Sequence, residues 1–158
     1  MSAKKIFQNH KNIGLFLILL VSLLTQGCFW PSSLERKARK KPYQKTIAMR
    51  VTAYCSCGKC CNWKRKWFIW PVVASGANKG NKKSVGISAD GTKAKKGTIA
   101  ADTRYYPFGT IMYIPGYGWG EVHDIGSKIK GKHIDVFFDS HSDALDWGNQ
   151  HLRVTIYK

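Results

Sequence analysis

The chain has 158 residues, of which 44% are hydrophobic, and a formal net charge of +17. A chain of this length provides one domain with one core, which excludes a second folded domain of ordinary size. The basic excess is uneven: residues 28–87 carry 14 Lys and Arg against one acidic residue, whereas residues 88–158 carry nine against eight. The first half therefore has the charge of a surface that meets polyanions.

Residues 1–27 have the pattern of a secretion signal. Lys4, Lys5 and Lys11 precede residues 13–24, a nearly unbroken run of Leu, Ile, Val and Phe. A basic start before a short apolar run is typical of a signal peptide, and a membrane-spanning helix needs about 20 apolar residues. We therefore expect export. An exported protein meets lipid headgroups, wall polymers and lipopolysaccharide, so nucleic acid is not expected as a partner; a solvated basic surface is the alternative.

The apolar run ends in Gly27-Cys28, which resembles the lipobox of bacterial lipoproteins. In that family, cleavage before the cysteine leaves it lipidated. The usual leucine three residues before the cysteine is displaced, because Thr25 occupies that place and Leu24 lies one residue further back. The resemblance implies an exported lipoprotein, anchored to a membrane through Cys28 and facing the periplasm or cell wall. The alternative is an uncleaved signal anchor with a free thiol.

Residues 28–46 predict a basic, flexible tether. This stretch contains Pro31 and Pro42 and the basic run at residues 36–41, with few apolar residues to bury. A segment of this composition cannot bury enough apolar surface to offset the entropy of ordering. The folded domain is therefore expected to begin at residue 47 and to continue to residue 158.

Short apolar segments separated by glycine fill most of residues 47–158 and predict strands. They lie at residues 49–54, 97–101, 110–114, 120–123, 133–138 and 152–156. One short helix is predicted after Ser140, because Asp143 three residues later makes a start like a capping box and Gly148 suits the end. Many short strands with one helix predict a mainly β domain, a small closed barrel. Residues 62–83 lack periodicity and predict a long loop or insertion over the barrel.

Three aspartates, Asp102, Asp124 and Asp135, each lie at or next to a predicted strand within apolar sequence. Burial of a carboxylate costs free energy unless it is paired or hydrogen-bonded. A shared site is one explanation, because crowded carboxylates repel and raise the pKa of one of them toward neutrality, as a general acid requires. The other explanation is that each aspartate accepts backbone hydrogen bonds in a turn.

A series of ordered motifs contains these aspartates and closely resembles the three-aspartate (3D) domain over residues 50–157. The motifs are Gly97-Thr98-Ile99-Ala100-Ala101-Asp102, Pro107-Phe108-Gly109-Thr110, Gly116-Tyr117-Gly118, Asp124-Ile125-Gly126, His133-Ile134-Asp135-Val136-Phe137-Phe138, and Ser140-His141. That domain is similar to the catalytic barrel of membrane-bound lytic transglycosylase A and to stationary-phase survival proteins. The resemblance implies a six-stranded double-psi β-barrel whose cleft holds the three aspartates.

The resemblance also implies a lytic transglycosylase that acts on peptidoglycan glycan strands. Such an enzyme cleaves the bond between N-acetylmuramic acid and N-acetylglucosamine and leaves a 1,6-anhydro end. Asp135 matches the acid/base, while Asp124 and Asp102 would tune its pKa and hold the sugar. No cofactor is required, and a monomer is expected. His133 is left out of the site, because we expect it to point to the opposite side of the strand from Asp135.

Two other functions remain open from the residues. A glycoside hydrolase would use two of the aspartates, with their separation setting the stereochemistry. A non-catalytic barrel would bind cell-wall glycan without cleaving it, since fold does not fix function. Several aromatic residues suit stacking on sugar rings, although core packing is the default for most of them. They are Trp63, Trp67, Trp70, Tyr105, Tyr106, Tyr117 and Trp119.

The remaining four cysteines form a cluster with the pattern Cys-x-Cys-x-x-Cys-Cys, at Cys55, Cys57, Cys60 and Cys61. In an oxidising compartment two short disulfides are favoured. A structural zinc ion held by the four thiolates is the less favoured alternative, and reduced thiols are the third. In each case the expected role is structural.

Overall fold

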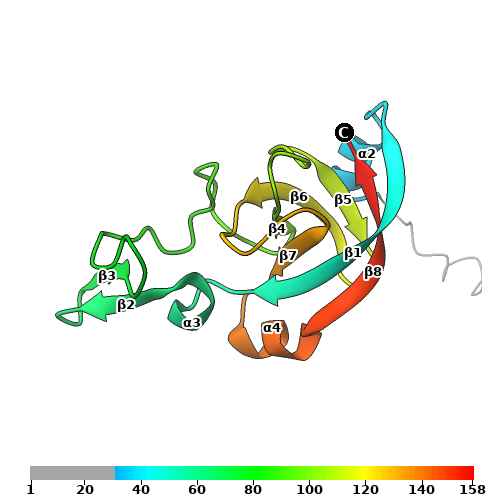
Figure 1. Ribbon diagram of the computed structural model, residues 1–158. Helices are drawn as coiled ribbons and strands as arrows, with labels where there is room; N and C mark the ends of the chain where they lie inside the picture. Colours follow the sequence, from blue (N-terminus) through cyan, green and yellow to red (C-terminus); the bar gives the residue numbers. More distant parts are fainter. Residues whose placement is uncertain (1–30) are drawn as a thin grey trace, which may run out of the picture. The chain divides into compact units, whose positions relative to one another are not determined.

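The structure is a computed structural model, and it describes residues 31–158 (Figure 1). The expected signal peptide and Cys28 lie outside this range. The segment Ser32–Lys158 forms one compact unit. No helix within residues 31–158 combines the length and apolar character needed to cross a bilayer.

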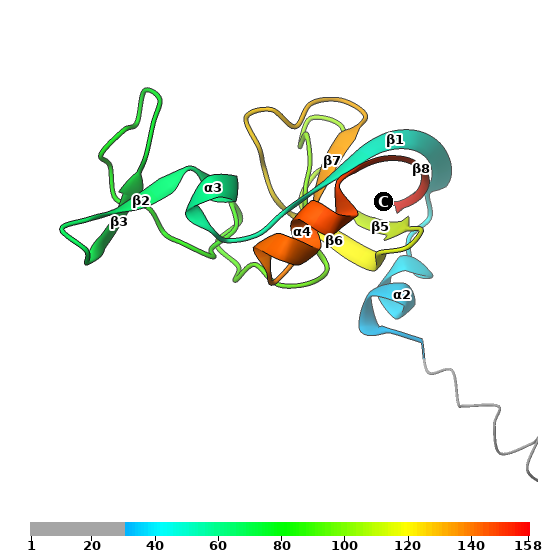
Figure 2. The same cartoon turned by 90° about the horizontal axis from the view of Figure 1, so that it is seen from below.

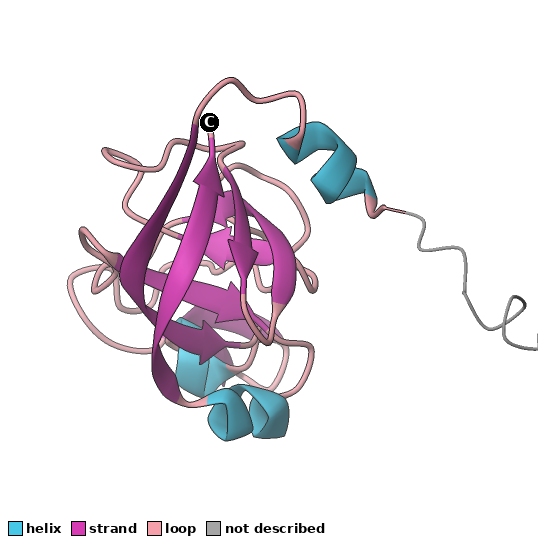
Figure 3. Cartoon of the chain, turned by 90° about the vertical axis from the view of Figure 1, so that its right-hand side faces the viewer, coloured by secondary structure: helices cyan, strands magenta, loops and turns pink. Residues whose placement is uncertain are grey.

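Six strands close into a barrel (Figure 3). They are β1 (Gln44–Tyr54), β4 (Thr98–Ala100), β5 (Ile111–Ile114), β6 (Gly118–Asp124), β7 (His133–Phe137) and β8 (Asn149–Tyr157). Around the barrel their order is β1-β7-β4-β6-β5-β8. The prediction of a mainly β fold with a small six-stranded barrel is confirmed.

The barrel consists of two equivalent halves, β1-β4-β5 and β6-β7-β8. The first strand of each half pairs in parallel with the middle strand of the other: β1 with β7, and β6 with β4. The other neighbours, including β1 with β8 and β5 with β6, are antiparallel. This reciprocal crossing of strands is the double-psi arrangement that the resemblance implies. It brings the ends of β1, β6 and β7 together.

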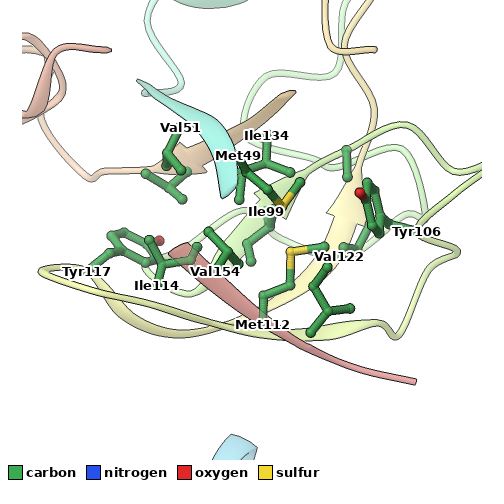
Figure 4. Close-up of a cluster of buried hydrophobic side chains, with 13 residues drawn as sticks. Met49, Val51, Ile99, Tyr106, Met112, Ile114, Tyr117, Val122, Ile134 and Val154 are labelled. Atoms are coloured by element: carbon green, nitrogen blue, oxygen red, sulfur yellow. The ribbon is translucent and has the colours of Figure 1, made fainter. Parts of the chain in front are cut away.

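The barrel interior is filled by aliphatic and aromatic side chains (Figure 4). Buried residues alternate along the strands, for example Met49 and Val51 in β1 and Val154 and Ile156 in β8, because successive side chains of a strand point to opposite faces. The strands β4 and β6 approach closely at Gly120, where an added Cβ would lie 2.6 Å from Cδ1 of Ile99. Only glycine fits at this position without a shift of the core.

Three helices accompany the barrel in the described residues. The predicted helix is α4 (His141–Trp147); the hydroxyl of Ser140 accepts a hydrogen bond from the Asp143 N–H at its start, and Gly148 ends it. The other two were not predicted. Helix α3 (Gly58–Cys61) is a single turn after β1, and α2 (Ser33–Ala38) precedes β1.

Residues 32–46 differ from the expected flexible tether. Ala38 of α2 is buried, and the Nζ atom of Lys37 lies 3.1 Å from a carboxylate oxygen of Glu121 in β6. Strand β1 begins at Gln44, which pairs with Tyr157 of β8. The sequence did not predict that this segment is ordered, because it is rich in basic residues. The lysines and arginines of α2 remain at the surface, and one small residue, Ala38, makes the buried contact.

The segment predicted as a loop over the barrel contains a separate β-hairpin, which extends to one side of the barrel (Figures 1 and 2). Strands β2 (Trp63–Lys66) and β3 (Trp70–Val73) form a two-stranded sheet apart from the barrel, and Val72 of β3 makes a single bridge to Lys82. At the tip of the hairpin, the side chains of Trp67 and Phe68 are exposed. Because little of the hairpin is buried, its sequence shows no alternation between apolar and polar residues.

Candidate active site

Asp124 and Asp135 flank one small residue of the barrel. Ala100 of β4 pairs in register with Asp135 of β7 on one side and with Asp124 of β6 on the other. The pairing of β4 with β6 shifts register between Ile99 and Ala100, which is where Asp124 comes opposite Ala100. Strands two positions apart are separated by about 10 Å, and the charge of Asp124 acts on the carboxyl of Asp135. The small side chain of Ala100 leaves space between the two carboxyl groups. The structure therefore brings these two predicted aspartates to one site.

Asp124 is held as a hydrogen-bond acceptor by three donors. Its Oδ1 accepts hydrogen bonds from the backbone N–H of Ala89, at 3.0 Å, and of Ile125, at 2.9 Å. Its Oδ2 accepts one from the hydroxyl of Tyr54, at 2.9 Å. Burial, together with the charges of Asp124 and Asp135, raises the pKa of Tyr54 far above its ordinary value. Tyr54 therefore keeps its proton and remains a donor to Asp124.

Asp135 has the environment of a general acid. The pKa of its carboxyl is raised to about 6: burial is the largest cause, the hydroxyl of Thr52 acts in the opposite direction, and the negative charge of Asp124 adds to the rise. Its Oδ1 is buried and has no hydrogen-bond partner within residues 31–158. A raised pKa at Asp135 was expected from carboxylate repulsion, but burial is the larger cause. A carboxyl group with this pKa can give and take a proton near neutral pH.

Asp102 is held by an ion pair with Arg104 and by a backbone hydrogen bond. Its Oδ1 accepts a hydrogen bond from Nε of Arg104, at 3.0 Å, and its Oδ2 accepts one from Nη2 of the same residue, at 2.8 Å. The backbone N–H of Gly131 donates a further bond to Oδ2, at 3.0 Å. These bonds, those to Arg104 foremost, hold the pKa of Asp102 well below its ordinary range. They tie the loop after β4 to the loop between β6 and β7, as expected for an aspartate that stabilises turns.

His133 was wrongly expected to point away from Asp135. Residues two apart on a strand share a face, and Thr52, which pairs in register with Asp135, shares a hydrogen bond of 2.9 Å with Nε2 of His133. Burial is the main cause that lowers the pKa of His133, with Arg50 adding to it. A neutral imidazole near pH 7 therefore lies beside Thr52, on the same side of the sheet as Asp135.

A cleft of about 420 Å³ lies between the end of the barrel and the segment that follows β1. Tyr54, Ala100 and Asp124 line its barrel side, and Lys83 lines the other. Asp102 and Asp135 are not among its lining residues. None of the seven aromatic residues considered for sugar stacking lines the cleft. The aromatic residue that does line it is Tyr54, the last residue of β1. Its place at the end of a predicted strand is the signal that could have identified it.

The four clustered cysteines are free thiols in the structure. The Sγ atoms of Cys55 and Cys60 are 3.7 Å apart, whereas the sulfur atoms of a disulfide are about 2.05 Å apart. The favoured expectation of two disulfides is therefore not met within residues 31–158.

The site is thus the half-buried carboxyl group of Asp135 beside the hydrogen-bonded carboxylate of Asp124, at the end of a double-psi barrel. Residues 97–158 match the family model of the 3D domain. The match contains Asp102, Asp124 and Asp135 and five of the six barrel strands, and it confirms the resemblance to this domain. Strand β1, which closes the barrel, lies outside the matched residues.

Two proteins of Bacillus subtilis (strain 168) are similar in sequence. YabE, named for cell wall shaping, is 43% identical over 58 residues, which cover 37% of this chain and 14% of YabE. The cell wall-binding protein YocH is 39% identical over 75 residues, which cover 45% of this chain and 26% of YocH. The chain therefore matches only a minor part of either relative.

Solved structures of MltA from Escherichia coli are similar over part of the chain. One of them, described as revealing a unique lytic transglycosylase fold, matches this chain with a TM-score of 0.40 and 21% sequence identity. The match covers 49% of this chain and 29% of MltA. MltA with bound chitohexaose has a TM-score of 0.39 and 20% identity, with 46% and 27% covered.

Proposed function

We propose that this protein cleaves cell-wall glycan as a lytic transglycosylase. The observation that carries the proposal is Asp135, a half-buried carboxyl group with a pKa raised to about 6, placed across Ala100 from the hydrogen-bonded Asp124. A protonated acid beside a carboxylate is the pair that cleavage of a glycosidic bond requires. The match to the 3D domain and the names of YabE and YocH support the cell wall as the place of action.

In the proposed reaction, protonated Asp135 donates its proton to the oxygen that joins N-acetylmuramic acid to N-acetylglucosamine. The bond to the muramic acid C1 breaks, and positive charge develops on that ring. The Asp135 carboxylate then takes the proton of the C6 hydroxyl of the same ring, whose oxygen bonds to C1. Asp135 is thereby returned to its protonated form, and no water is consumed. Asp124 stabilises the developing positive charge, and Tyr54 fixes its orientation.

A second candidate is a barrel that binds cell-wall glycan without cleaving it. One observation favours it: Asp135 does not line the cleft, so a glycan seated there meets Tyr54 and Asp124 first. A two-carboxylate hydrolase is a third: water replaces the C6 hydroxyl as acceptor, and the second aspartate acts as base or nucleophile. All three share the glycan strand as ligand.

Mass spectrometry of purified peptidoglycan after incubation with the protein distinguishes these functions. New 1,6-anhydro ends support the transglycosylase, and new reducing ends identify a hydrolase. Unchanged glycan that nevertheless retains the protein in a pull-down assay identifies a binding module. Asp135→Asn serves as the matched control, because it removes the transferable proton and keeps the size of the side chain.

The proposed function also includes a location. We propose that the protein is exported and held at a membrane by lipid on Cys28, facing the periplasm or the cell wall, and that it acts as a monomer on glycan strands. The basic segment after Cys28 then lies near the membrane, where anionic headgroups attract lysine and arginine.

A further inference from the structure

Three sulfur atoms and one ring nitrogen converge next to the end of β1. Nδ1 of His141 lies 3.8 Å from Sγ of Cys55 and 3.5 Å from Sγ of both Cys57 and Cys60. Cys55 and Cys60 are 3.7 Å apart at Sγ, and all four atoms lie within 4.8 Å of one another. The cluster joins two distant parts of the chain, since His141 begins α4.

These separations are those of ligands around a tetrahedral metal ion. Zinc binds sulfur at about 2.3 Å and imidazole nitrogen at about 2.0–2.1 Å. At tetrahedral angles, two sulfur ligands are then about 3.8 Å apart, and a sulfur and a nitrogen are about 3.6 Å apart. The four measured distances agree with these values. Tetrahedral sulfur and nitrogen donors are the set that selects zinc among the common divalent ions.

Hydrogen bonding does not account for the cluster. A histidine Nδ1 carries one proton or one lone pair and can satisfy one of the three sulfurs. Thiols are also weak donors and acceptors, so they do not draw three side chains onto one atom. A central cation gives every one of the four atoms a partner at once.

The local backbone suits a thiolate ligand. Cys57 caps the N-terminus of α3, and its Sγ accepts a hydrogen bond of 3.5 Å from the backbone N–H of Cys60. The tight turn depends on Gly58, where an added Cβ would lie 2.3 Å from the carbonyl oxygen of Trp63. The indole N–H of Trp63 donates to the carbonyl of Ser56 at 2.8 Å, which fixes the turn from the other side.

The fourth cysteine, Cys61, is directed elsewhere. Its thiol donates to the backbone carbonyl of Cys55, at 3.2 Å, and it lines the cleft beside Asp124. The Cys-x-Cys-x-x-Cys-Cys pattern alone suggested four thiolates, but the structure replaces the last of them with a histidine 80 residues further along the chain. We propose that one zinc ion binds at this cluster, held by Cys55, Cys57, Cys60 and His141.

The proposed site is structural, because its four protein ligands leave no open position for substrate. It would join the turn after β1 to the start of α4. Tyr54 directly precedes the first ligand, and Ser56, Cys60 and Cys61 line the cleft. The metal would therefore stabilise the wall of the cleft from which Tyr54 reaches Asp124, whether or not the protein cleaves glycan.

The test is metal analysis of the full-length protein, purified in detergent under reducing conditions without metal-affinity resin. We expect about one zinc per chain, as for a closed four-ligand site. His141→Ala and Cys57→Ser should each lose most of this zinc. Cys61→Ser is the matched control, because it removes the neighbouring thiol outside the cluster, and it should retain the zinc. Removal of zinc by a chelator should lower the melting temperature of the wild type and of Cys61→Ser.

Cobalt provides an independent measurement. Replacement of zinc by Co²⁺ should give the intense visible absorption of a tetrahedral thiolate site in the wild type and in Cys61→Ser. Three results would overturn the proposal. The first is wild-type protein without stoichiometric zinc under these conditions, and the second is zinc lost from Cys61→Ser and kept by His141→Ala. The third is a disulfide between cluster cysteines, found by mass spectrometry of protein whose free thiols were alkylated at cell lysis, before any reductant was added. Circular dichroism checks that each variant is folded, and a variant that folds only with added zinc also supports the site.

Discussion

The hydroxyl of Tyr54, at the end of β1, donates a hydrogen bond of 2.9 Å to Oδ2 of Asp124, at the end of β6. These strands are not neighbours in the barrel, since β7 and β4 lie between them. The bond therefore joins the ends of two strands across the end of the barrel. It fixes the carboxylate of Asp124, whose negative charge is one of the causes that raise the pKa of Asp135.

Asp135→Asn should abolish most glycan cleavage while the fold is kept. Asparagine has nearly the size of aspartate but no transferable proton, and general acid–base catalysis contributes about 10² to 10⁴-fold. The rate of anhydro-muropeptide release, followed by mass spectrometry, should fall by about this factor. Asp146→Asn, on the exposed surface of α4, is the control and should keep the wild-type rate. A wild-type rate for Asp135→Asn would remove Asp135 from the mechanism and make Asp124 the leading candidate.

Asp124→Asn should shift the pH dependence of activity. The proton donor must be protonated, so wild-type activity should fall as the pH rises above the pKa of Asp135, about 6. The charge of Asp124 is one of the causes that raise this pKa. Without it the pKa falls, and the alkaline limb of the pH–rate profile should move to lower pH. An unchanged limb, with only a lower rate, would show that Asp124 does not act through the pKa of Asp135.

Asp135→Asn should also stabilise the protein at alkaline pH. A folded-state pKa above the ordinary value of 3.8 means that the folded state binds the proton more tightly than the unfolded chain does. Wild-type stability therefore falls as the pH rises from about 4 to 6 and remains lower above that. The neutral variant avoids this loss. Its melting temperature should exceed that of the wild type by roughly 3–8 °C at pH 8 and by little at pH 4. Equal melting temperatures at both values would contradict the burial of a charged Asp135.

Asp102→Asn should destabilise the fold at neutral pH. Its lowered pKa means that the charged form is favoured in the folded state, so its contribution to stability is present above the unfolded pKa of about 3.9 and is lost as the pH falls. The variant should melt lower than the wild type at pH 7, by about 2 °C or more, and the difference should shrink below about pH 4. Thermal unfolding followed by circular dichroism measures this. A difference that is independent of pH would assign Asp102 a role other than its ion pair with Arg104.

Cys28→Ala should prevent lipidation. The apolar run followed by Gly27-Cys28 resembles a lipobox, and a thioether-linked lipid would form only on a cysteine. Metabolic labelling with a fatty-acid analogue should tag the wild type and miss the variant. Cys61→Ser is the control and should be labelled as the wild type is. Equal labelling of wild type and Cys28→Ala would exclude lipid at this position.

The strands of the barrel were predictable because each buries one face. In β1, for example, Met49 and Val51 are buried and Arg50 between them is exposed. Helix α2 was not, because its order depends on Ala38 and on an ion pair between Lys37 and Glu121, residues 84 positions apart. The motifs identified all three aspartates. Their division into the Asp124–Asp135 pair and the Arg104-bound Asp102 depends on strand register, which sequence spacing does not determine. His141 was missed as a cluster member because it lies more than 80 residues from the cysteines in sequence, and only the fold brings them together.

The pairing of β1 has a consequence for how the chain folds. This strand is synthesised first, yet it lies between β7 and β8, the last two strands of the barrel, with Gln44 opposite Tyr157. Contacts between such distant residues carry a large loop-closure entropy and slow folding. The barrel therefore cannot close before the C-terminal strand is available, and a chain that still lacks β8 has exposed strand edges. Loss of residues 149–158, which contain β8, would open the barrel at β1 and β5 together.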